Sequence, residues 1–199
     1  MLLSGFYAVL DRDDEALARL LVGAGGAKIL QVRIKPGETT DVVRVAKLAR
    51  KVCDDAGAWL VVNDRVDIAL AVRADAVHLG QNDLSIPDAR SIAGDRLAIG
   101  ISTHNLHQVE AAVAQRPDYI AYGPVFATTT KQNPDPVQGL DALRIAAEAA
   151  GTIPLVAIGG ITPANAREVY AAGASAICAI SAVNNASDVT AAARSFSRV

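Results

Sequence analysis

The sequence predicts an α/β fold, a (β/α)8 TIM barrel formed as a single domain over residues 1–199. Short apolar runs rich in Val, Ile, Leu and Tyr alternate with helix-spaced stretches rich in Ala, Leu, Arg and Glu. Runs that are apolar on both faces are typical of parallel strands covered by helices. Eight such units in 199 residues come to about 25 residues each, near the lower size limit of this fold.

The predicted strands and helices follow one another along the chain. Strands are predicted at residues 6–10, 28–32, 59–62, 76–79, 97–101, 119–122, 155–158 and 176–180. Helical spacing lies between them, for example at residues 14–22, 40–55, 106–114, 141–150 and 164–171. Gly57, Gly94, Gly151 and Gly173 stand where helices must end.

Two glycine patterns help to choose between related folds. A doubly wound open sheet usually carries a glycine fingerprint after its first strand, but here residues 11–14 contain no glycine. The glycine-rich residues 23–26 precede a strand, whereas a phosphate loop follows a strand and leads into a helix. We therefore expect a closed barrel, with residues 23–26 forming only a helix end and a turn.

Composition excludes several classes of function. The 19 Lys and Arg residues against 21 Asp and Glu give a net charge of −2, so the chain has no basic excess for nucleic acid or membrane surfaces. The sequence shows neither a signal peptide nor an apolar run of about 18 residues, and we expect a cytoplasmic protein. Cys53 and Cys178 lie far apart and are expected to be small buried residues.

Polar residues gather where the predicted strands end. In a barrel this end carries the active site. The residues concerned are Gln31, Arg33 and Lys35 after the second strand, Asn63 and Asp64 after the third, Gln81 and Asp83 after the fourth, Ser102 and Thr103 after the fifth, Thr128, Thr129, Thr130 and Lys131 after the sixth, Gly159 and Gly160 after the seventh, and Ser181 after the eighth.

Asp64 and Asp83 are the candidate metal ligands. Two carboxylates from adjacent strand ends suit Mg²⁺, which binds through one or two carboxylates together with substrate phosphate oxygens. The alternative is that each aspartate caps the helix after it. The cations Arg33, Lys35 and Lys131 are expected at the same rim, where solvated charges are the alternative to a diphosphate site.

A second phosphate site is predicted at the ends of the last strands. Gly160 and Ser181 follow the seventh and eighth strands, where barrels commonly bind phosphate. Among the histidines, His78 alternates within an apolar strand and is interpreted as a core residue with its hydrogen bonds made. His104 and His107 flank a helix start, where capping or solvent exposure is expected.

Six stretches, taken in order, resemble the thiamine-phosphate synthase family. They are QVRIK at residues 31–35, VNDR at 62–65, AVHLGQND at 76–83, IGISTH at 99–104, YGPVFATTTK at 122–131 and AIGGITP at 157–163. The resemblance runs from about residue 6 to residue 183. It implies a (β/α)8 barrel that joins a hydroxymethylpyrimidine diphosphate to a hydroxyethylthiazole phosphate, with Mg²⁺ as cofactor.

The resemblance also implies a role for each matching residue. The pyrimidine diphosphate would be bound by Gln31, Arg33, Lys35, Asn63, Ser102 and Lys131, of which Arg33, Lys35, Ser102 and Lys131 are the expected catalytic residues. The thiazole phosphate would be bound by Thr128, Thr129, Thr130, Gly160, Ile180 and Ser181. Asp64 and Asp83 would bind Mg²⁺. These substrates are the expected partners, and the oligomeric state stays open because any apolar outer helix face could form an interface.

Departures from the family pattern are small. Val32 replaces a familiar leucine, and residues 132–136 form an atypical stretch, interpreted as a mobile flap. Three other functions remain alternatives: a thiazole tautomerase, which would carry a histidine where this chain has Pro124; a Schiff-base aldolase using Lys131 or Lys35; and a noncatalytic phosphometabolite sensor.

Overall fold

Eight parallel strands close into a barrel in the order in which they occur along the chain. The structure is a computed structural model that describes residues 3–35, 37–128 and 135–197. The strands are β1 (Gly5–Leu10), β2 (Ile29–Val32), β3 (Trp59–Asn63), β4 (Ala76–Leu79), β5 (Ala98–Thr103), β6 (Tyr119–Tyr122), β7 (Leu155–Ile158) and β8 (Ala176–Cys178). Parallel pairing of β8 with β1 closes the ring, and the predicted fold class is confirmed.

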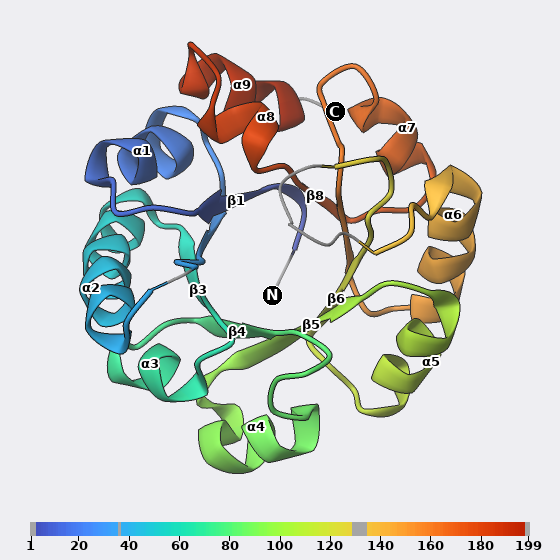
Figure 1. The fold of residues 1–199 in the computed structure, drawn as a ribbon, viewed down its shortest axis with the longest axis horizontal. Coiled ribbons are helices and arrows are strands. Elements are labelled where there is room, and N and C mark those ends of the chain that lie inside the picture. The colour runs from blue at the N-terminus through green and yellow to red at the C-terminus, as the bar shows by residue number, and fades with distance from the viewer. Residues whose placement is uncertain (1–2, 36, 129–134, 198–199) are drawn as a thin grey trace.

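Helices form an outer ring around the strands (Figure 1). Within the described residues they are α1 (Glu15–Arg19), the π-helical turn η1 (Leu20–Ala24), α2 (Thr39–Ala56), α3 (Val66–Ala71), α4 (Ile86–Ala93), the 3-10 turn η2 (Gly94–Arg96), α5 (Leu106–Ala114), α6 (Gly139–Ala150), α7 (Ala166–Ala171), α8 (Ser181–Asn184) and α9 (Val189–Ser197). The α9 helix packs against β1 and η1, so the last described helix lies beside the first strand.

Several predicted boundaries differ from the structure, and the fifth strand, for example, is Ala98–Thr103 rather than residues 97–101. The last strand ends at Cys178 rather than at residue 180, because Ile180 already takes up the N-cap position of α8. The first helix, expected over residues 14–22, is α-helical only to Arg19 and continues as the wider turn η1. Residues 23–26 do form a helix end and a turn before β2, as predicted, and Gly26 has a φ of 77°.

Side-chain alternation divides the core into two layers. Residues on one face of each strand pack against the helices and make up the larger apolar cluster, which also contains Cys53. Residues on the other face fill the barrel interior, and these include Tyr7, Val9, Val61 and Tyr119. The interior therefore contains two tyrosines and a histidine, His78, in addition to aliphatic side chains.

Polar braces join neighbouring strands at the opposite end of the barrel from the predicted site. Asp75, just before β4, accepts a hydrogen bond from the backbone N–H of Leu60 in β3 at 2.7 Å. Asp118, just before β6, accepts one from Ile99 in β5, also at 2.7 Å. The hydroxyl of Ser175, before β8, accepts a hydrogen bond from the backbone N–H of Leu155 in β7 at 3.3 Å. These contacts satisfy strand N–H groups that would otherwise lack a partner.

An arginine supports each of the two acidic braces. Arg50 of α2 lies 2.6 Å from Asp75, and Arg90 of α4 lies 2.7 Å from Asp118. Both aspartates thus connect a strand, the strand beside it and an outer helix. In the part of the chain that the structure describes, no helix is both long enough and apolar enough to cross a bilayer.

Candidate active site

A cavity of about 1030 Å³ opens where the strands end and the next helices begin. It is lined by all eleven of the predicted site residues that the structure describes: Gln31, Arg33, Lys35, Asn63, Asp64, Asp83, Ser102, Thr128, Gly160, Ile180 and Ser181. Thr129, Thr130 and Lys131 lie outside the described residues. The barrel thus brings together side chains from loops that are distant in the sequence.

The two candidate metal ligands lie next to each other in this cavity. Burial raises the pKa of the Asp83 carboxyl, and the neighbouring Asp64 carboxylate raises it further. Asp83 also accepts a hydrogen bond from the backbone of Gly80 at 2.7 Å. Asp64 pairs with Lys35 at 2.6 Å. Asp83 caps no helix, since Ser85 is the N-cap of α4.

Backbone geometry directs Asp64 into the cavity. This residue has a φ of 63°, a left-handed conformation that is uncommon for a residue with a side chain. Its backbone N–H donates to the carbonyl of His78 at 2.8 Å, which holds the end of β3 to β4. Strained backbone of this kind persists where the surrounding structure fixes it, and it is concentrated at functional sites.

The carboxylate pair supplies some, but not all, of the ligands that a divalent cation needs. Within residues 3–35, 37–128 and 135–197, no three His, Cys, Asp or Glu side chains gather as a metal-binding group. Two adjacent carboxylates with mutually unfavourable charge nevertheless provide the oxygen ligands that Mg²⁺ uses. The other ligands would have to be water molecules and substrate oxygens.

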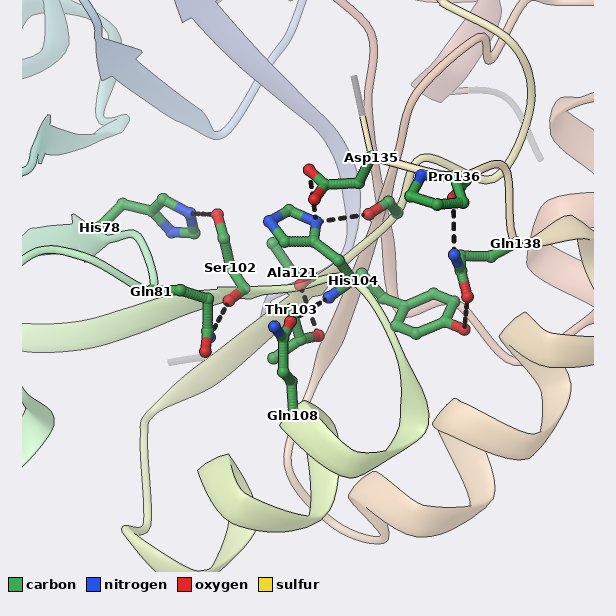
Figure 2. Close-up of polar contacts among 12 residues, drawn as sticks. His78, Gln81, Ser102, Thr103, His104, Gln108, Ala121, Asp135, Pro136 and Gln138 are labelled. Atoms are coloured by element: carbon green, nitrogen blue, oxygen red, sulfur yellow. Dashed lines mark hydrogen bonds and ion pairs between the residues drawn. The ribbon is translucent and has the colours of Figure 1, made fainter. Parts of the chain in front are cut away.

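A continuous chain of hydrogen bonds crosses the barrel interior below the charged rim. Gln31 Nε2 donates to the Tyr7 hydroxyl at 2.9 Å, and the Tyr7 and Tyr119 hydroxyls are 2.9 Å apart. The Tyr119 hydroxyl lies 2.9 Å from Nδ1 of His78. Nε2 of His78 lies 2.8 Å from Oγ of Ser102, the contact drawn in Figure 2. We call these five side chains the relay.

Four of the five relay side chains are buried and Ser102 is half-buried, and the relay is electrically neutral at pH 7. Burial is the main cause that lowers the pKa of His78 to about 4, and the nearby Arg33 lowers it further, while Asp83 opposes the shift. Burial also raises the pKa values of Tyr7 and Tyr119. The interpretation of His78 as a buried histidine with both ring nitrogens hydrogen-bonded is confirmed, although its ring also lines the cavity.

His104 connects the fifth strand with the segment after the sixth (Figure 2). Its Nδ1 lies 2.7 Å from the carbonyl oxygen of Gly123 and 3.6 Å from the Asp135 carboxylate. The expectation that His104 caps a helix is wrong, because Asn105 is the N-cap of α5. The His104 side chain is not fully exposed to solvent either, since only 23% of it is accessible. The exposed position expected for His107 is confirmed.

The glycines after β7 allow two loops to approach closely. Gly160 has a φ of 63°, and a Cβ atom there would lie 2.4 Å from the carbonyl oxygen of Ala127. Any side chain at this position would therefore force apart the loops that follow β6 and β7. Thr128, Ile180 and Ser181 line the cavity on this side.

Comparison with known proteins assigns the chain to a family. The family model described as thiamine monophosphate synthase matches residues 6–183. This chain belongs to the thiamine-phosphate synthase family. Within that family, the thiamine-phosphate synthase of Chloroflexus aurantiacus is 48% identical over 170 residues, covering 85% of this chain and 78% of its own. The synthase of Methanoculleus marisnigri is 48% identical over 185 residues, covering 93% and 87%.

A solved structure agrees with this assignment. The thiamine phosphate pyrophosphorylase from Pyrococcus furiosus superimposes with a TM-score of 0.88 at 38% identity, covering 98% of this chain and 93% of its own. The family resemblance found in the sequence is thereby confirmed, and the chain is an enzyme, a transferase of the thiamine-phosphate synthase family. A 3-hexulose-6-phosphate synthase, with a TM-score of 0.71 at 18% identity, shares the fold alone.

Sequence reasoning missed part of the cavity wall. Tyr7 and Tyr119 were classed only as apolar strand residues, yet both present hydroxyls to the interior. The sequence did carry a signal, which is the position of each tyrosine in the alternating strand pattern. Tyr7 is two residues from Val9 and Tyr119 is two residues from Ala121, so all four point to the inward face. That signal identifies the face but not which residues meet across the barrel.

Proposed function

We propose that this thiamine-phosphate synthase condenses 4-amino-2-methyl-5-hydroxymethylpyrimidine diphosphate with 4-methyl-5-hydroxyethylthiazole phosphate, giving thiamine phosphate and diphosphate. The observation that carries the proposal is the charge arrangement of the cavity, where Arg33 and Lys35 share one rim with the adjacent carboxylates of Asp64 and Asp83. Such a rim suits a diphosphate bound together with a divalent cation.

The family resemblance supplies the proposed role of each residue. Gln31, Asn63 and Ser102 bind the pyrimidine diphosphate together with Arg33, Lys35 and Lys131. On the other side of the cavity, the loop containing Thr128, Thr129 and Thr130 binds the thiazole phosphate with Gly160, Ile180 and Ser181. The two substrates then lie between the two groups of residues, which raises their effective concentration.

Mg²⁺ is the proposed cofactor, and Asp64 and Asp83 are the residues that would hold it. When bound, Mg²⁺ offsets the negative charge that develops on the diphosphate oxygens. Lys35 already lies on Asp64, so cation binding at the pair is expected to shift this lysine toward the substrate. The side chains of Arg33, Lys35 and Lys131 neutralise the rest of the charge on the diphosphate leaving group.

The proposed chemistry is dissociative. The bond between the pyrimidine methylene carbon and the diphosphate oxygen breaks first, and its electron pair leaves with the diphosphate. The aminopyrimidine stabilises the methylene cation, and the thiazole nitrogen then forms the new C–N bond with its own lone pair. No proton has to be removed from the nucleophile, so the site needs no general base.

The aldolase alternative is disfavoured for Lys35. A Schiff-base lysine must lose its proton, which requires a desolvated pocket or neighbouring cations. The Lys35 ammonium instead lies 2.6 Å from the Asp64 carboxylate, and half of the side chain is exposed. This exposed, ion-paired position is not the desolvated pocket that such a lysine needs.

The direct test is an assay of the purified protein with both substrates, with and without Mg²⁺. Thiamine phosphate is measured by oxidation to its fluorescent thiochrome derivative. Mg²⁺-dependent product supports the proposal. A folded protein that forms no product under either condition would contradict it and favour the tautomerase or the noncatalytic sensor.

Asp64→Asn is expected to lower turnover by about a hundredfold while leaving the fold intact, because the amide keeps the shape of the side chain but removes its charge. The measurement is kcat at saturating Mg²⁺, with circular dichroism to verify the fold. Asp141→Asn is the matched control, since the Asp141 side chain is 96% exposed on α6. Equal activity of the two variants would remove Asp64 from the proposed metal site.

A further inference from the structure

The relay contains a directional feature that its distances alone do not reveal. Each hydroxyl has one proton to donate, and a neutral imidazole carries one proton on one of its two nitrogens. A chain of such groups can therefore be ordered in only two ways, with every proton pointing toward Ser102 or every proton pointing away from it. The direction decides what Ser102 can offer to a ligand.

The amide at the far end of the relay sets the direction. Gln31 donates from Nε2 to the oxygen of Tyr7 at 2.9 Å, so the Tyr7 proton is available to Tyr119. Tyr119 in turn donates to Nδ1 of His78, which must then be unprotonated. A neutral His78 consequently carries its proton on Nε2 and donates it to Oγ of Ser102. The proton of the Ser102 hydroxyl is then left for a ligand.

The opposite direction gives Ser102 a different character. It requires the Gln31 amide to present its oxygen to Tyr7, which then donates to it and accepts from Tyr119. His78 would carry its proton on Nδ1, and the Ser102 proton would be used on Nε2. Ser102 would then present only lone pairs to the cavity, and a diphosphate, which offers no proton, would be repelled by them.

We propose that His78 is a positioning residue that, as the Nε2–H tautomer, accepts from Tyr119 and donates to Ser102, and so fixes the Ser102 hydroxyl as a hydrogen-bond donor to the substrate diphosphate. The inference rests on the proposed function and names a residue that acts through Ser102 rather than on the substrate.

Packing holds both ends of the contact in place. His78 is 8% exposed, and its ring stacks on that of Tyr119 with centroids 5.5 Å apart. The carbonyl oxygen of Ser102 accepts a hydrogen bond from Gln81 Nε2 at 2.6 Å, as Figure 2 shows. With the backbone of Ser102 and the ring of His78 both fixed, the remaining freedom is rotation within the Ser102 side chain, which the Nε2–H group restricts.

The first test is nuclear magnetic resonance of the protein without substrates. The chain has three histidines, and His104→Gln and His107→Gln variants assign the ring nitrogens of His78 by elimination. The expected spectrum at pH 7 shows Nε2 protonated and Nδ1 unprotonated. A proton on Nδ1, or a fast-exchanging mixture, would overturn the proposal.

The second test separates action through Ser102 from a merely structural role. In His78→Gln the amide can reach the position of Nε2, whereas the shorter side chain of His78→Asn reaches only that of Nδ1. We expect His78→Asn to lower kcat by about tenfold to a hundredfold without raising the KM for the thiazole phosphate. His78→Gln is expected to retain most of the activity.

A double-variant cycle completes the test. If His78 acts through Ser102, His78→Asn causes no further loss of kcat in a Ser102→Ala background. An equal loss in both backgrounds would show that the two residues act independently and would overturn the proposal.

A wild-type protein with the Nε2–H tautomer but no synthase activity would refute the proposed function. It would also remove the diphosphate as the ligand of Ser102. An active enzyme with the Nδ1–H tautomer would refute the relay alone.

Discussion

Gly100 in β5 makes room for the central aromatic ring of the barrel. A Cβ atom at this position would lie 2.0 Å from Cζ of Tyr119, deep inside the steric limit. The Tyr119 ring has little space to move away, because it is fully buried and its hydroxyl is hydrogen-bonded to Tyr7 and His78. The absence of a side chain at residue 100 is thus a condition for the relay.

Gly100→Ala is accordingly expected to lower the free energy of unfolding by about 1–3 kcal/mol, the usual cost of overpacking. Urea denaturation followed by circular dichroism measures the change. Gly23→Ala is the control, because Gly23 is exposed and a Cβ atom there meets nothing within 4 Å. A Gly100→Ala protein as stable as the control would show that the Tyr119 ring can shift freely.

At the scale of elements, the acidic braces hold neighbouring strands and an outer helix together. Asp118→Ala leaves the buried N–H of Ile99 without its carboxylate partner and removes the ion pair with Arg90. We expect the free energy of unfolding to fall by about 1–3 kcal/mol, the cost of an unsatisfied buried donor. The comparison is with Asp141→Ala, which removes an exposed pair with Arg144 on α6. Equal urea midpoints for the two variants would contradict a bracing role.

The whole molecule is expected to lose stability on mild acidification because of His78. Its pKa is about 4 in the folded protein, against an ordinary value of 6.5 that the unfolded chain should show. Below pH 6.5 the unfolded chain therefore takes up a proton that the folded protein excludes. The stabilisation is complete above pH 6.5 and is lost as the pH falls toward 4.

Between pH 7.5 and 5.5 this single group should lower the free energy of unfolding by about 1 kcal/mol. Urea denaturation at the two pH values measures the change, and His78→Gln should show a smaller one. Asp83, whose pKa is raised, acts in the opposite direction wherever it titrates. The same pH dependence in His78→Gln would assign it to other groups.

The sequence predicted the barrel well because strand and helix patterns are local. Eight apolar runs matched eight strands, and polar residues at their ends, such as Arg33 and Asp64, line one cavity. The relay could not be predicted in this way. Which inward residues meet depends on strand register around the closed barrel, and Tyr7 and Tyr119 are 112 residues apart. Likewise, the side-chain direction of His104 depends on where β6 ends beside it.

The braces and the barrel closure also differ in how far along the chain their partners lie. Each brace joins residues only 15 to 20 positions apart, so it can form while most of the protein is still unfolded. Closure pairs Tyr7 with Cys178 and has to wait for the last strand. During refolding, helix and strand signals should therefore return before catalysis, since the first and sixth strands meet in the relay only in the closed ring.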